Sequence, residues 1–207
     1  MNEITAITPQ IKDKKRCNIF IDGRFYCGLT LETTVKNRLK VGQIISPDTL
    51  SQIQLESEKG VALDKALTHI SATRKTEKQV RDFLSQKGYL SNVTDYVIEK
   101  MKGYGFLNDA EYAEAYAACV GAKKGKRLIR MELKGKGVSD EELESAMDGL
   151  DEETQTEAAK RILEKYMRSK TADKETLYKA FRYLLGKGFE VETAKRALSL
   201  YGDCEEE

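Results

Sequence analysis

The sequence is poor in the residues from which catalytic and metal sites are usually built. Its 207 residues include one histidine, two prolines and no tryptophan. The four cysteines, Cys17, Cys27, Cys119 and Cys204, form no CxxC pair and lie in no cysteine–histidine pattern, which argues against a zinc site and favours reduced thiols. His69 has no cysteine or carboxylate partner nearby in sequence, so we expect a structural or exposed imidazole rather than a catalyst.

Long apolar runs and an excess of charge are also missing. No stretch approaches the roughly 18–20 uninterrupted apolar residues of a membrane span, and residues 1–15 contain no apolar run of signal-peptide length. The formal net charge is +1, so any affinity for nucleic acid must come from a local cluster. We therefore expect a cytosolic protein with no membrane contact. No two carboxylates stand out as an acid and a base, although a fold could still unite distant carboxylates into an enzyme site.

The first thirty residues predict a small sheet. Asp22-Gly23 lies between runs of apolar, β-prone residues, which is a strong signal for a two-residue hairpin turn. Both faces of this hairpin carry large apolar groups. We therefore expect residues 4–7 to add a third strand and a helix around residues 31–39 to cover the sheet.

The same turn predicts a register for the hairpin. With two residues in the turn, Ile21 pairs with Arg24, and Asn18 pairs with Cys27. Because side chains alternate between the two faces of a strand, this register places Cys17 and Cys27 on opposite faces. A disulfide between these cysteines is therefore disfavoured.

Beyond residue 47 the apolar residues follow a helical period, and one short motif recurs three times. An amphipathic helix ends in Lys-Gly and an apolar residue, with the glycines 49 and 51 residues apart: Lys87-Gly88-Tyr89, Lys136-Gly137-Val138 and Lys187-Gly188-Phe189. Glycine supplies the left-handed residue that ends a helix. A near-constant period of this length is typical of stacked helical units rather than of an enzyme core. Thr76 and Gln79 predict a capping box at the start of one such helix.

These signals predict a mainly α fold, a tandem array of three three-helix repeats that forms an elongated, curved body behind a small β-hairpin or three-stranded extension. One repeat is too small to bury much apolar surface alone, so each should pack on its neighbour. The predicted boundaries are 1–60 for the N-terminal extension with its helix, 61–107 for the first repeat, 108–152 for the second and 153–207 for the third. Such an array presents long surfaces, which favours a function in binding.

The densest charge cluster precedes and enters the middle helix of the second repeat. From residue 123 to residue 136, seven basic side chains face a single acidic one, a net charge of +6. The run is either a patch that faces an anion, such as phosphates or an acidic protein groove, or an ordinary solvated linker. The candidates for contact with such an anion are Lys123, Lys124, Lys126, Arg127 and Arg130, and we expect the first four to be exposed. Arg74 and Lys75 form the matching cluster one repeat earlier.

Two glycine patterns invite comparison with nucleotide-binding loops, and neither fits. Gly121-x-x-x-Gly125-Lys126-Arg127 has one residue too few between its glycines and lacks the Ser or Thr that would ligate magnesium. Residues 103–105, Gly-Tyr-Gly, lack the third glycine and the preceding strand of a dinucleotide site. We therefore expect no cofactor and no metal.

Three segments, in this order and at this period, resemble the RecX family, the regulatory proteins of the bacterial RecA recombinase. The first is Arg-Lys-Thr-Glu at 74–77, which leads to Leu84 and residues 87–89. The second is Tyr-Gly-Phe-Leu-Asn-Asp at 104–109, followed by Tyr112 and Ala113. The third is Lys-Gly-Lys at 124–126, followed by Ile129, Glu132, Leu133 and residues 136–138. Residues 18–23 also resemble the β-extension that many members carry. The likeness covers most of the chain, although the third repeat has no counterpart of the Gly-Lys cluster.

The resemblance implies an array of three-helix repeats that lies in the groove of the RecA–DNA filament. There the family limits filament growth and lowers the ATPase, strand-exchange and coprotease activities, and it has no catalytic site to carry over. The leading hypothesis is a monomeric, non-enzymatic regulator that acts in recombination, repair and the SOS response. Its partner would be the RecA filament, with backbone contacts to single- or double-stranded DNA. The alternative is a helical module that binds nucleic acid directly through its basic patch, without a specific RecA contact.

Overall fold

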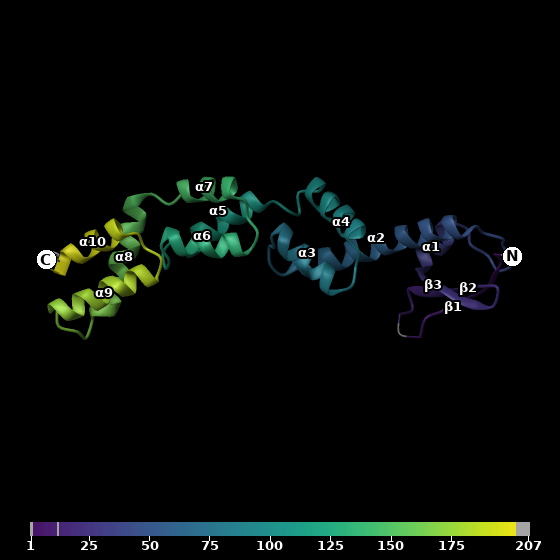
Figure 1. Cartoon of the computed structure of the whole chain (residues 1–207), viewed down its shortest axis with the longest axis horizontal. Helices are drawn as coiled ribbons and strands as arrows, with labels where there is room; N and C mark the ends of the chain where they lie inside the picture. Colours follow the sequence, from purple (N-terminus) through teal and green to yellow (C-terminus); the bar gives the residue numbers. More distant parts are fainter. Residues whose placement is uncertain (1, 12, 202–207) are drawn as a thin grey trace. The chain divides into compact units, whose positions relative to one another are not determined.

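The computed structural model describes residues 2–11 and 13–201, so Cys204 lies outside the described residues. A three-stranded sheet is followed by helices α1 to α10 and a short 3-10 helix (Figure 1). The chain divides into two compact units. One contains residues up to Thr73 together with Val80–Tyr104, and the other contains Arg74–Gln79 together with residues from Gly105 onward. The predicted class, mainly helical with a small N-terminal sheet, is confirmed. None of the described helices combines the length and the apolar character that crossing a membrane requires.

The N-terminal sheet is antiparallel, with the strand order β1-β2-β3. Its strands are β1 (Ile4–Pro9), β2 (Arg16–Ile21) and β3 (Arg24–Thr30). The turn between β2 and β3 consists of Asp22 and Gly23, with φ of 46° and 79°. Asp-Gly favours this left-handed backbone because it matches the twist of a hairpin. Both the predicted hairpin and the predicted third strand are confirmed.

A β-bulge changes the register that the turn alone predicts. The two residues that flank the turn pair as expected, but Tyr26 is an extra residue in β3. Ile19, rather than Asn18, therefore lies opposite Cys27. The predicted placement of Cys17 and Cys27 on opposite faces is wrong, because one inserted residue reverses the alternation of β3. Both thiols are buried and free.

The buried face of the sheet packs against the start of α2 (Pro47–Ser71). Leu50 and Ile53 of this helix join an apolar cluster with the buried sheet residues, which are Ile4, Cys17, Ile19, Cys27 and Leu29. The helix expected to cover the sheet is short: α1 spans Leu31–Lys36, and its Val35 is 74% exposed. The predicted segment does lie against the sheet, through Thr34 and Leu39, but it is not the main cover. A six-residue helix that turns an apolar side chain outward buries too little surface, and α2 provides the cover instead.

The second half of α2 begins the first three-helix repeat, which continues with α3 (Glu77–Gln86) and α4 (Ser91–Gly103). The predicted capping box is present at α3. The amide of Gln79 donates to Oγ1 of Thr76 at 3.3 Å, and the amide of Thr76 donates to Oε1 of Gln79 at 3.1 Å. Because α2 is continuous across residue 60, the extension and the first repeat share one helix. The boundaries at 60, 107 and 152 stay a prediction.

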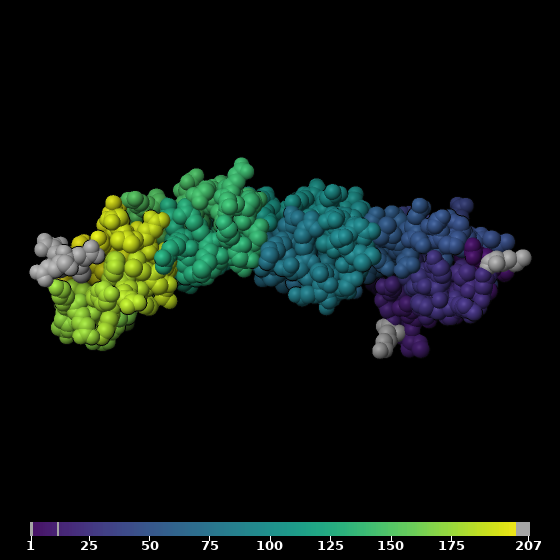
Figure 2. Space-filling model, viewed as in Figure 1, coloured from purple at the N-terminus to yellow at the C-terminus, as the bar shows by residue number. Residues whose placement is uncertain are grey.

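The second repeat consists of α5 (Asp109–Val120), α6 (Lys126–Gly135) and α7 (Asp140–Asp148). The third consists of α8 (Glu152–Met167), α9 (Lys174–Gly186) and α10 (Val191–Leu198), followed by the 3-10 helix Ser199–Tyr201. Each has its own apolar cluster, centred on Leu133 in the second repeat and on Leu184 in the third. In the space-filling view the third repeat packs directly against the second (Figure 2).

The Lys-Gly motif has the same backbone structure in all three repeats. Gly88, Gly137 and Gly188 have φ of 83°, 89° and 88°, which confirms that they are left-handed helix stops. The amide that follows each glycine bonds back at 3.2 Å to a leucine carbonyl of the middle helix: Tyr89 to Leu84, Val138 to Leu133, and Phe189 to Leu184.

In the second and third repeats the glycine also lies against an earlier segment of its own compact unit. A Cβ at Gly188 would be 2.3 Å from Cβ of Leu128 in α6, and a Cβ at Gly137 would be 2.5 Å from Cβ of Lys78 in α3. At Gly88 the same position has no described atom within 4 Å. Close packing therefore requires glycine at positions 137 and 188, whereas at Gly88 only the left-handed backbone favours it.

Candidate functional site

The basic run lies at the junction of α5 and α6. Gly125 is the N-cap of α6, so the run begins in the connection and continues into the helix, as predicted. The connection carries two candidates and the first turns of α6 carry three: Lys123 and Lys124, then Lys126, Arg127 and Arg130.

The N-terminus of α6 is closed by the third repeat. The amide of Gly125 donates to the carbonyl of Lys187 at 3.0 Å, and the amide of Arg127 donates to the carbonyl of Gly188 at 3.1 Å. The first amides of a helix often bind phosphate because they have no partner within the helix. Here these two amides already have carbonyl partners, so they offer no phosphate cradle.

Lys124 belongs to an internal network. Its Nζ donates to Oε1 of Glu132 at 2.5 Å, and the hydroxyl of Tyr116 donates to Oε2 at 2.6 Å. Burial alone would raise the pKa of Glu132, but the hydrogen bonds from Lys124 and Tyr116 outweigh it and hold this pKa below its usual 4.5. The bond to Glu132 also raises the pKa of Lys124. Because the Lys124 side chain is only 29% exposed, the expectation of an exposed residue is corrected here.

Both candidate arginines also bind within the protein. Nη2 of Arg127 donates to the carbonyl of Leu185 in α9 at 2.8 Å, which links the second repeat to the third. Nη2 of Arg130 donates to Oε2 of Glu144 in α7 at 2.8 Å. Arg127 remains exposed, but a partner that bound either guanidinium would compete with an internal hydrogen bond.

Three candidates form no ion pair with any of the described residues, namely Lys75, Lys123 and Lys126. Lys123 is exposed, whereas Lys126 and Lys75 are half-buried. The amide of Lys126 donates to Oε1 of Gln155 at 3.1 Å, which fixes the main chain. The ammonium forms no ion pair among the described residues, although its charge helps to lower the pKa of Asp151 after the stronger effect of the hydrogen bonds from Thr154. These three charges are the ones most available to an anionic partner.

The second predicted cluster, Arg74 and Lys75, lies at the other end of α6. Thr76, the next residue, donates its hydroxyl to the carbonyl of Lys136 at 2.7 Å, and Arg74 lies 4.0 Å from Glu111 at the start of α5. The ten residues of α6 put about 15 Å between this end and the basic run. The structure therefore places the two clusters at opposite ends of one helix rather than at one point.

The sequence reasoning counted Lys134 and Lys136 in the basic run but did not select them. Lys134 pairs with Asp140 at 2.9 Å, and Nζ of Lys136 lies 5.6 Å from the centroid of the Tyr116 ring. Lys136 also helps to lower the pKa of Glu132, after the stronger effects of Lys124 and Tyr116. The sequence feature that could have singled out Lys136 is its place in the Lys-Gly motif.

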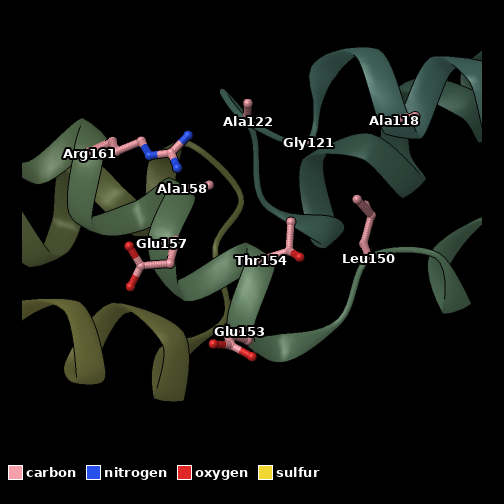
Figure 3. Close-up of a pocket in the computed structure, with 9 residues that line it drawn as sticks. All are labelled: Ala118, Gly121, Ala122, Leu150, Glu153, Thr154, Glu157, Ala158 and Arg161. Carbon is pink, nitrogen blue, oxygen red and sulfur yellow. The ribbon is translucent and has the colours of Figure 1, made fainter.

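A cavity of about 350 Å³ lies between the end of α5 and α8 (Figure 3). Its lining consists of Leu150, four small residues and four polar side chains. The small residues are Ala118, Gly121, Ala122 and Ala158, and the polar ones are Glu153, Thr154, Glu157 and Arg161. None of the predicted contact residues lines this cavity. Glu157 pairs with Lys160 at 2.8 Å, and no cluster of His, Cys, Asp and Glu among the described residues could hold a metal ion. The candidate site is therefore the basic surface along α6.

Family models match the extension and each of the three repeats separately. The regulatory protein RecX N-terminal domain matches residues 2–46. The first, second and third RecX three-helix domains match residues 62–101, 108–147 and 153–198. The matched segments follow the order of the sheet and the helical repeats described above.

Curated relatives and solved structures agree with these matches. The regulatory protein RecX of Clostridium perfringens (strain 13 / Type A) is 32% identical to this chain and covers 92% of both chains. That of Clostridium beijerinckii is also 32% identical and covers 96% of this chain and 95% of its own.

Two crystal structures show the same fold. A regulatory protein RecX has a TM-score of 0.70 at 23% identity, over 93% of this chain and 97% of its own. RecX from Lactobacillus salivarius has a TM-score of 0.65 at 24% identity, over 70% of this chain and 96% of its own. The resemblance read from the sequence is confirmed, and the chain belongs to the RecX family of regulatory proteins.

Proposed function

We propose that this protein binds the RecA–DNA filament and mainly inhibits its ATPase, strand-exchange and coprotease activities. The observation that carries the proposal is the match of all three helical repeats and of the extension to RecX domains. Tandem repeats suit a partner that is itself periodic, because each copy can present a similar surface to successive subunits. The protein would act as an intracellular monomer and would catalyse no reaction itself.

The basic surface along α6 is the proposed contact. Lys75, Lys123 and Lys126 would bind carboxylates of the filament groove or phosphates of its DNA, because none of the three forms an ion pair with a described residue. Arg74 and Arg127 would contribute at the edges of this surface. Lys124 and Arg130 would act mainly by holding α6 in place, since Glu132 and Glu144 already bind them.

The direct test measures DNA-dependent ATP hydrolysis by RecA while this protein is titrated below one molecule per RecA subunit. Inhibition at such ratios, with shorter filaments in electron micrographs, is the expected result. An unchanged hydrolysis rate together with unchanged filament lengths would show that the proposal is wrong.

The alternative function, a helical module that binds DNA without a RecA contact, makes a different prediction. It requires equal affinity for bare DNA and for the filament, with a steep salt dependence in both cases. The filament proposal requires much tighter binding to the filament. Fluorescence anisotropy at two salt concentrations, with bare DNA and with RecA-coated DNA, separates the two.

A further inference from the structure

The lysine of each Lys-Gly motif lies over an aromatic ring. Its Nζ is 5.3–5.6 Å from a ring centroid in all three repeats: Lys87 over Phe83, Lys136 over Tyr116, and Lys187 over Tyr183. These are cation–π distances. The fold accounts for the glycine, which ends the helix, but the lysine before it has ordinary right-handed helical φ and ψ at Lys136 and Lys187. Many residue types could adopt that backbone, so the lysine is not there to shape the turn.

A second aromatic ring stacks beside the first in each repeat. The ring centroids are 4.0 Å apart for His69 and Phe83, 6.1 Å apart for Tyr112 and Tyr116, and 4.7 Å apart for Tyr166 and Tyr183. We call each pair of rings, with its Lys-Gly lysine, a ring–lysine site. One such site occurs in every repeat, although the residues that build it differ between repeats.

Two further lysines, Lys170 and Lys179, lie close to Tyr166 in the ring–lysine site of the third repeat. Lys179 and Lys187 lie four residues before and after Tyr183, so the three side chains follow one side of α9 at intervals of about 6 Å. Nζ of Lys170 lies 3.0 Å from the ring centroid of Tyr166. Tyr183 is 37% exposed, so a ligand can reach its ring without unfolding the repeat.

Acidic residues distinguish the second and third sites. In the second repeat, Glu132 occupies the position four residues before the lysine, and it neutralises Lys124 through a 2.5 Å contact. In the third repeat that position is Tyr183. Lys179 pairs with Glu175 on the exposed surface of α9, where an ion pair is weak and exchangeable. The third site is therefore the one best suited to a polyanion.

We propose that the ring–lysine site of the third repeat binds single-stranded nucleic acid, with one base stacked on Tyr183 and the adjacent phosphates bound by Lys179 and Lys187. Lys187 would move from the ring to a phosphate as the base takes its place. The ligand chemistry follows from the pairing of rings with lysines: an acidic protein surface needs lysines but no rings, whereas single strands offer both a flat base and a phosphate at each step. A duplex hides its base faces, so it would bind less well.

This contact requires neither RecA nor the basic surface along α6, and it can be tested on the protein alone. The probe is a fluorescein-labelled oligothymidylate, compared with an abasic oligomer of the same length and with a duplex, by fluorescence anisotropy. The abasic strand keeps every phosphate and removes every base. We expect the full-length protein to bind oligothymidylate about tenfold more tightly than the abasic strand, because an effect of this size lies within the range that stacking one base on a ring contributes.

Variants of α9 then locate the contact. Tyr183→Leu should weaken binding of oligothymidylate about tenfold and leave binding of the abasic strand unchanged, while Tyr183→Phe should bind like the parent. Tyr178→Leu is the matched control, since Tyr178 lies on the same helix and is 60% exposed but belongs to no ring–lysine site. Lys187→Ala should reduce the salt dependence of binding for both strands.

Two results would overturn the proposal. Equal affinity of the parent protein for the thymidylate and abasic strands would show that no base is stacked, and this comparison needs no variant. Unchanged binding of oligothymidylate by a folded Tyr183→Leu protein would place any stacking elsewhere. Neither result bears on RecA inhibition, so the filament proposal stands or falls separately.

Discussion

The hydroxyl of Thr76 donates a 2.7 Å hydrogen bond to the carbonyl of Lys136, 60 residues further along the chain. The same oxygen accepts the amide of Gln79 at the start of α3. Thr76 is fully buried, so one side chain both caps α3 and satisfies a carbonyl at the end of α6. It therefore joins the segment Arg74–Gln79, which contains the start of α3, to the Lys-Gly turn of the second repeat within one compact unit.

Thr76→Val should lower the free energy of unfolding by about 1–3 kcal/mol. Valine keeps the shape of threonine but leaves the carbonyl of Lys136 and the amide of Gln79 without a partner. Urea unfolding followed by circular dichroism measures the change. Thr76→Ser, which restores the hydroxyl, should recover most of the loss, and equal midpoints for the Val variant and the parent would contradict this account.

The three Lys-Gly turns should tolerate alanine unequally. Gly88→Ala should cost about 1–2 kcal/mol, the usual penalty for a left-handed backbone at a residue with a Cβ. Gly188→Ala should cost about 1–3 kcal/mol more, because its Cβ would lie 2.5 Å from the backbone nitrogen of Leu128. The two positions share nearly the same φ, so the difference isolates repeat packing. Thermal unfolding of both variants measures it, and equal losses would disprove the packing argument.

The sequence predicted those parts of the fold whose signals are local. The Asp22-Gly23 turn, the capping box of Thr76 and Gln79 and the three glycine stops each depend on a few adjacent residues, and all are present in the structure. The bulge at Tyr26 could not be predicted in the same way. It has no local sequence mark, yet it moved Cys27 to the other face of its strand.

The position of the basic run in a helix was also predicted, but the state of its charges was not. The basic run does enter α6, because charge density is visible in sequence. Whether a given charge is free depends on partners far along the chain. Arg127 binds the carbonyl of Leu185, 58 residues away, and only the fold reveals this bond. The stacking of Tyr166 on Tyr183 was missed for a similar reason, since the two rings come from different helices.

Glu132 should make the stability of the second repeat sensitive to acid. Its pKa in the folded protein lies below the usual 4.5, since the hydrogen bonds from Lys124 and Tyr116 outweigh the effect of burial. The folded state therefore holds this proton less tightly than the unfolded state. The resulting stability is present above about pH 4.5 and is lost as the pH falls through the folded pKa.

Glu132→Gln should consequently destabilise the protein at neutral pH, and the gap between variant and parent should narrow below about pH 4.5. Urea midpoints at several pH values measure both effects. Glu164→Gln, at an exposed position of α8, is the matched control and should leave the parent curve almost unchanged. A gap that stayed constant from neutral to acid pH would show that the charge of Glu132 contributes nothing.

Lys123→Ala combined with Lys126→Ala should weaken inhibition of RecA several-fold at low salt, and the defect should shrink as salt rises and screens the remaining contacts. Neither lysine forms an ion pair among the described residues, so the free energy of unfolding should change little. This pair is a cleaner test than a variant that also removes Lys124 or Arg127, because those side chains hold Glu132 and the third repeat.

The matched control is Lys165→Ala combined with Lys174→Ala, which removes the same charge from exposed positions in α8 and α9. Titrating each double variant into the RecA ATPase assay compares the concentrations that give half-maximal inhibition. If the contact depends on position, only the α6 pair shifts this concentration. If both pairs shift it equally, overall charge rather than the surface along α6 governs binding, and the contact assignment fails even though the fold and the family remain as described.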